Sequence, residues 1–137
     1  MIDAIAKKGT HRTLHFKCAP LPDSYNFSFS GIKTAVLYHH RDHKDDADFS
    51  VNSVAHAFQE SIVTNLTQKC ITACQKLKTK TLLIGGGVAA NSELRQQLNC
   101  EAASHGINVY FPPLSVCTDN AAMIAGLGFH LVKKRRK

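Results

Sequence analysis

The sequence lacks the features that would place it in an oxidising compartment or in a membrane. It has five cysteines, an odd number, and no CxxC pair. This pattern argues against a disulfide framework and a zinc knuckle, and it favours a reduced, cytoplasmic setting. The N-terminus has no long apolar stretch typical of a signal peptide, and no run approaches the ~20 apolar residues of a membrane span. We therefore expect a cytoplasmic protein with no membrane partner.

Acidic residues are scarce: 17 lysines and arginines oppose 10 aspartates and glutamates, which gives a formal net charge of +7. Part of this excess lies in the basic tail, residues 133–137 (KKRRK). Such a run can contact phosphates, but like-charge runs are more often solvated ends. Both interpretations stay open. We assign residues 1–132 to one folded unit and residues 133–137 to the tail.

A length of 137 residues and an apolar content of 44% fit one globular domain. A chain of this size buries a real core, but it cannot easily hold two lobes around a deep cleft. Apolar periodicity predicts helices at 2–8, 32–39 and 51–77, from Asn91 or Ser92 to Gly106, and from Thr118 or Asp119 to 132, with strands at 13–17, 81–84 and 108–111. The exposed connection is expected at 41–48. The order of these elements indicates an α/β fold, helix-rich with a few strands.

The long helix at 51–77 is expected to present one apolar face, because its apolar residues recur in steps of three and four. Ser50 or Asn52 would cap it, and a break near its middle is left open.

The first candidate site is the glycine turn in TLLIGGGVAANSELR, residues 81–95. Glycines after a strand let the backbone approach a ligand because no Cβ intervenes, and the next helix offers unpaired N–H groups. Asn91 could hydrogen-bond a ribose or a phosphate there. Three consecutive glycines, Gly85, Gly86 and Gly87, exceed what a turn needs, yet an ordinary turn explains them equally well. The segment lacks the GxGxxG dinucleotide spacing.

Asp119, in the segment CTDN at 117–120, is the second candidate. An aspartate at this point is either a plain helix N-cap or a carboxylate offered to a metal, and spacing alone favours the cap. The helix behind it is rich in alanine and glycine, so it is expected to pack closely beneath a site.

Two weaker candidates lie near the predicted helix at 32–39. Lys33 falls in its first turn, where a cation is unfavourable unless an anion accompanies it. His39, His40 and His43 are close in sequence, but they lack the HExxH pattern or paired cysteines that make a metal site a strong prediction. A solvated lysine and surface histidines are the alternatives.

Three segments taken together are more specific than any one of them: FSFSGIKTAV at 27–36, GGGVAANSELR at 85–95 and CTDNAAMIA at 117–125. In order and general spacing they closely resemble the tRNA N6-adenosine threonylcarbamoyltransferase family, once named O-sialoglycoprotein endopeptidases. The resemblance covers about residues 2–131. It implies part of the second lobe of an actin-like, two-lobed ATPase fold of the sugar kinase and Hsp70 type.

The resemblance also implies an activity and a set of partners. Family members transfer a threonylcarbamoyl group from an adenylate intermediate to N6 of the adenine 3′ of the anticodon, in tRNAs that read codons beginning with A. They hold an iron or zinc ion near the phosphate. In bacteria they work with a paralogous actin-like partner and a small P-loop ATPase. The expected ligands are therefore tRNA, threonylcarbamoyl-adenylate or a similar adenine nucleotide, and a divalent metal.

The resemblance also implies roles for individual residues. Asn91 matches the asparagine of the family's GGVAAN, which contacts the bound adenylate, and the turn 85–87 matches the place where the adenosine lies. Asp119 matches the aspartate of CTDN, a metal ligand. Ile2 and Asp3 resemble the family's GGPxID stretch, which makes Asp3 another nucleotide contact.

Other family segments have no counterpart here: the HxxxH pair of metal ligands, the SGGHT phosphate loop and the DDAxGEAFDK segment. All three precede GGPxID in the family, so positions 39–43 and 56–60 do not substitute for the histidine pair. Asp119 alone cannot hold a transition metal, which needs about three protein ligands. We expect a C-terminal portion that is inactive alone or needs an N-terminal piece. A non-catalytic module that binds nucleotide, tRNA or a partner is the alternative. A peptidase is disfavoured, since HExxH and Ser/His/Asp spacings are absent.

Overall fold

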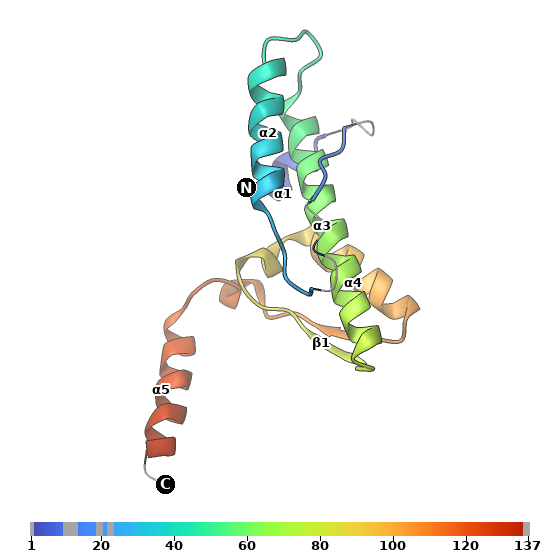
Figure 1. Ribbon diagram of the computed structural model, residues 1–137. Coiled ribbons are helices and arrows are strands. Elements are labelled where there is room, and N and C mark those ends of the chain that lie inside the picture. Colours follow the sequence, from blue (N-terminus) through green and yellow to red (C-terminus); the bar gives the residue numbers. More distant parts are fainter. Residues whose placement is uncertain (1, 10–13, 19–20, 22–23, 136–137) are drawn as a thin grey trace.

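The computed structural model describes residues 2–9, 14–18, 21 and 24–135 (Figure 1). The helices are α1 (Ile2–Ala6), α2 (Ser30–His43), α3 (Val51–Lys76), α4 (Ser92–Ser104) and α5 (Ala121–Arg135), the strands are β1 (Thr81–Leu83) and β2 (Asn108–Tyr110), and the 3-10 helices are η1 (Gly87–Ala90) and η2 (Leu114–Val116). The prediction of a helix-rich α/β fold with few strands is therefore confirmed.

A strand–helix–strand unit forms the C-terminal half of the core. β1 and β2 pair in parallel, with Leu82 opposite Val109, and α4 supplies the crossover that parallel strands require. One face of α4 is apolar, and its residues Leu94, Leu98 and Ala102 are all buried. This face packs against the C-terminal half of α3.

Helix α3 is the central element, and α1, α2, α4 and β1 all contact it (Figure 1). It runs unbroken for 26 residues, so the suggested break is absent. Ser50 is its cap, with Oγ accepting the Ser53 N–H at 3.3 Å, whereas Asn52 lies inside the helix. The predicted apolar face is confirmed in part: Val54, Phe58, Ile62 and Cys70 pack against the core, whereas Val51 and Leu77 at the ends of the face are exposed. Because neighbouring elements pack on several sides of α3, some of its polar side chains are buried too.

One predicted strand and one predicted helix end also differ from the structure. Thr13 lies outside the described residues, and residues 14–17 of the expected strand have no strand partner. Phe16 instead donates its N–H to Ser61 Oγ of α3 at 3.3 Å, and its ring is buried against Ile32 of α2. Helix α2 continues through residues 41–43 of the expected connection, since that polar stretch contains no glycine or proline to end it.

Helix α5 projects away from the rest of the chain (Figure 1). Its large apolar side chains are exposed, namely Met123, Ile124, Leu127, Phe129, Leu131 and Val132. The expectation that this helix packs beneath a site is therefore wrong for this chain. The helix reaches Arg135, so the first part of the basic tail is helical rather than a frayed end. No helix in the described part of the chain is long and apolar enough to cross a membrane.

Removing residues 121–137 is expected to leave the stability of the remaining fold almost unchanged. Helix α5 contributes no residue to the described buried core, and isolated helices of this length are marginal in water. We expect the free energy of unfolding in urea to change by less than about 0.5 kcal/mol. A loss above about 1 kcal/mol would show that α5 packs on the core in solution.

Candidate functional site

The glycine turn joins β1 to α4 and is open on its outer side. Gly86 has φ = 92°, in the left-handed region that glycine adopts without steric cost, and it directly precedes η1. A Cβ placed on Gly85, Gly86 or Gly87 would meet no atom within 4 Å. The turn therefore leaves room for a ligand to approach the backbone.

Asn91 ends this turn and caps α4, as predicted. Its Oδ1 accepts the Leu94 N–H at 2.9 Å, and its Nδ2 donates to Gln59 Oε1 of α3 at 2.8 Å. These two bonds fix which end of the amide is oxygen and which is nitrogen. One Nδ2 hydrogen then remains for another acceptor. Nothing in the sequence distinguishes Gln59 from Gln68 and Gln75, which occur on the same helix.

Asp3, from the other end of the sequence, lies at the N-terminus of α4. Its two carboxylate oxygens accept the Ser92 hydroxyl at 3.0 Å and the Ser92 N–H at 3.1 Å. The sequence predicted unpaired N–H groups at this helix end. That prediction is wrong for Ser92 and Leu94, because Asp3 and Asn91 accept from them. An aspartate suits this position, since the positive end of the helix dipole favours a carboxylate.

The surroundings of Asp3 lower the pKa of its carboxyl. Burial alone would raise the pKa, but the backbone N–H and hydroxyl of Ser92, the charge of Lys7 and the Gln59 amide together outweigh it. Because the folded pKa lies below the unfolded one, ionised Asp3 stabilises the fold above about pH 4, and this stabilisation is lost as the pH falls through the folded pKa.

Asp3→Asn is accordingly expected to cost about 1 kcal/mol at pH 7, the typical value of a lost helix cap. The difference from the unaltered chain should shrink as the pH falls below about 4, where the wild-type carboxylate is itself protonated. Urea unfolding at several pH values measures this. Asp45→Asn is the control, because Asp45 is exposed in the connection before α3. A constant difference at all pH values would contradict the assignment.

Arg95 connects the glycine turn to the loop that leads to CTDN. Its Nε donates to the Ala89 carbonyl at 2.6 Å, and its Nη2 donates to the Pro112 carbonyl at 2.7 Å and lies 3.4 Å from Cys117 Sγ. The guanidinium also lies over the Phe111 ring, 4.9 Å from its centroid. The two predicted site segments are thus held together by a residue that the sequence did not single out.

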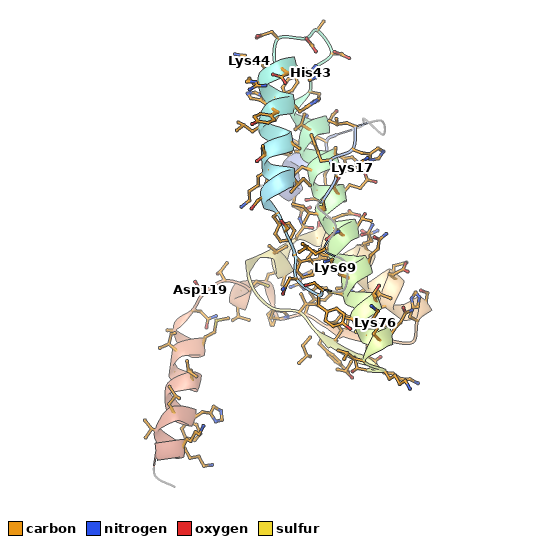
Figure 2. All side chains as sticks on the ribbon, in the orientation of Figure 1. Lys17, His43, Lys44, Lys69, Lys76 and Asp119 are labelled. Atoms are coloured by element: carbon orange, nitrogen blue, oxygen red, sulfur yellow. The ribbon has the colours of Figure 1, made fainter. Side chains whose placement is uncertain are left out.

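Asp119 is exposed just before α5 and has no hydrogen bond or ion pair within the described residues (Figure 2). The cap interpretation, which spacing favoured, is wrong: Asn120 Oδ1 accepts the Met123 N–H at 3.2 Å, so Asn120 caps the helix. Across residues 2–9, 14–18, 21 and 24–135, no group of three or more His, Cys, Asp or Glu side chains is placed to hold a metal. Asp119 thus has no metal-binding companions there.

The weaker candidates lie away from this turn. His39 and His43 line a cavity of about 240 Å³ between α2 and the start of α3, where His43 Nδ1 is 2.8 Å from Asp46 Oδ2. Burial and the neighbouring His43 lower the pKa of His39. Lys33 is exposed and forms no ion pair with any residue that the structure describes.

These features define an α/β unit with an open glycine turn between a parallel strand and a helix. Its fold is similar to part of the crystal structure of T. kodakarensis HypF, with a TM-score of 0.64 and 15% identity over 94% of this chain and 16% of that one. Residues 1–126 match the family of tRNA N6-adenosine threonylcarbamoyltransferases, and the chain belongs to this family.

Relatives of that name share substantial sequence with it. The protein of Thermotoga neapolitana is 44% identical over 98% of this chain, and that of Dictyoglomus turgidum is 42% identical over 99%. The chain spans about 40% of the length of these curated relatives. The family resemblance of the sequence is therefore confirmed.

Proposed function

We propose that this chain is the adenosine-binding C-terminal portion of a tRNA N6-adenosine threonylcarbamoyltransferase. Family membership supports a role in tRNA modification. The observation that carries the proposal is the open turn 85–87 beside Asn91, whose amide has one free hydrogen. An adenosine placed along the turn would contact the exposed backbone and the free Nδ2 hydrogen of Asn91. The strand–helix–strand unit is proposed to be part of the second lobe of an actin-like fold.

In the proposed reaction the N6 amine of adenine attacks the carbamoyl carbon of threonylcarbamoyl-adenylate. A new N–C bond forms, the bond from that carbon to the phosphate oxygen breaks, and AMP leaves with the electron pair while the amine loses a proton. Within this chain, the glycine turn and Asn91 would hold the adenosine of the leaving AMP. Holding one reactant in place lowers the barrier by removing orientational freedom.

The proposed iron or zinc does not fit the described residues on their own. Asp119 is a lone carboxylate, and metal sites of this kind need about three protein ligands. We therefore assign no chemical step to a metal bound by this chain alone. The phosphate side of the pocket, the paralogous actin-like subunit and the small P-loop ATPase belong to the same proposal and lie outside this chain.

Titration of the chain with AMP by calorimetry tests the proposal. Asn91→Ser is the informative variant, because serine still caps a helix but lacks the amide donor. We expect it to weaken AMP binding about fivefold to tenfold, as one lost hydrogen bond implies. Asn99→Ser, on an exposed position of the same helix, should bind like the unaltered chain. Absence of AMP binding by the unaltered chain at millimolar concentrations would refute the proposal.

The alternative is a non-catalytic module that binds tRNA through its positive charge. The net charge of +7 favours this possibility. In that case tRNA binding should fall steeply with salt, and Asp119→Ala should leave it unchanged. Binding of AMP that Asn91→Ser weakens would favour the enzyme portion instead.

A further inference from the structure

Gln59 is an unusual residue for its place in the fold. It lies on α3 with only 6% of its surface exposed, and a buried amide is costly unless it is hydrogen-bonded. Gln75 lies sixteen positions further along the same helix and is exposed, so a glutamine on α3 is not buried as a rule. The cost of burying the Gln59 amide must therefore be offset by specific hydrogen bonds.

The amide of Gln59 lies between two residues that the sequence placed in the nucleotide site. Its Oε1 accepts from Asn91 Nδ2 at 2.8 Å, and its side chain is also among the groups that stabilise the ionised form of Asp3 and so lower its pKa. Asn91 precedes α4, and its neighbour Ser92 is bonded to Asp3 of α1, so α1, α3 and α4 meet at this point.

We propose that Gln59 is a positioning residue of the adenosine site, which sets the direction in which Asn91 presents its free Nδ2 hydrogen. This inference rests on the proposed function. Asn91 has two amide hydrogens and one of them is bound to Gln59, so the planar amide can turn only with loss of that bond. The cap bond to Leu94 restrains the other end of the same amide. Gln59 thus acts on a ligand through Asn91 without touching it.

Two substitutions separate positioning from simple space filling. Gln59→Leu keeps a similar volume but removes the acceptor, and we expect AMP affinity to fall about fivefold to tenfold, the effect of one lost hydrogen bond. Gln59→Glu keeps an acceptor but brings a second carboxyl near Asp3. The charged groups at this end of the adjoining helices include Asp3 and Lys7 of α1 and Glu93 and Arg95 of α4, with Arg95 turned to the Pro112 carbonyl.

The like charge of Asp3 favours the neutral form of the introduced carboxyl. Gln59→Glu should therefore bind AMP almost normally near pH 5, where that carboxyl is neutral, and progressively less well toward pH 8, where it is ionised. Gln75→Leu and Gln75→Glu are matched controls and should show neither change. NMR of the Asn91 side-chain NH₂ group provides a second readout, because its signals should move in Gln59→Leu and stay in place in the controls.

The outcomes distinguish this inference from the proposed function. If the unaltered chain binds AMP and Gln59→Leu binds it equally well, the positioning role is overturned while the proposed function stands. If Gln59→Glu shows the same pH profile as Gln75→Glu, the role is likewise overturned. If the unaltered chain does not bind AMP at all, the proposed function fails, and the inference fails with it.

Discussion

Gly9→Ala is expected to destabilise the fold by about 1–3 kcal/mol, the usual cost of forcing extra volume into a packed contact. A Cβ on Gly9 would lie well within the van der Waals contact distance of the Asn52 carbonyl oxygen and 2.7 Å from His56 Cβ. Most of this obstacle is backbone of α3, which cannot turn aside as a flexible side chain would. Helix α1 must therefore shift away from α3.

The displacement should reach the candidate site, because Asp3 is carried by α1. We expect amide exchange to become faster in α1 and at Ser92, whose N–H is bonded to Asp3 at 3.1 Å. Urea unfolding measures the stability, and hydrogen exchange measures the local loosening. Gly31→Ala is the matched control: its Cβ would meet nothing within 4 Å, and alanine favours the helix by about 0.5–1 kcal/mol. Equal effects at both positions would contradict the clash.

Arg95→Met should be the most damaging change among the polar residues of the site. It removes the hydrogen bonds to the Ala89 and Pro112 carbonyls while keeping a side chain that can lie against Phe111. Hydrogen bonds to a charged group contribute about 1.5–3 kcal/mol, so we expect a loss of about 2–3 kcal/mol. The glycine turn and the loop before CTDN would no longer be tied to each other.

Thiol labelling reports on this connection directly. Cys117 is 1% exposed and lies against Arg95, so its labelling, located by peptide mass spectrometry, should speed up in Arg95→Met. Arg95→Lys should fall in between, because an ammonium group lacks the fork that bridges two carbonyls. Arg41→Met is the control, since Arg41 is exposed and contacts Tyr38 and Asp42 of its own helix, far from the site in sequence. Unchanged Cys117 labelling in Arg95→Met would show that the loop is held by other contacts.

The elements that the sequence predicted best are those with local causes. An apolar run followed by glycines marks β1 and its turn, and Asn91 caps α4 within three residues of its partner. The start of α5 was misplaced because three successive residues, Thr118, Asp119 and Asn120, all suit a helix cap. Which of them caps depends on the path of the preceding loop, and the local pattern does not contain that information.

The candidate site could be predicted only in part, because local patterns do not contain its long-range contacts. The turn and Asn91 stand out in sequence, but their supports come from distant positions. Gln59 is 32 residues from Asn91, and Asp3 is 89 residues from Ser92. Arg95 holds loop atoms as far as 22 residues away. Such contacts depend on how the helices pack, so a glutamine or an arginine that makes them looks like any other in the sequence.

The carboxylate of Asp3 at the beginning of α4 has a consequence for selectivity. A bare helix N-terminus attracts any small anion, free inorganic phosphate included. Here the protein supplies its own anion, so free phosphate would have to displace a group attached to the same chain and held by two hydrogen bonds to Ser92. Recognition at this turn would then depend on the uncharged nucleoside, and background phosphate would compete poorly for it.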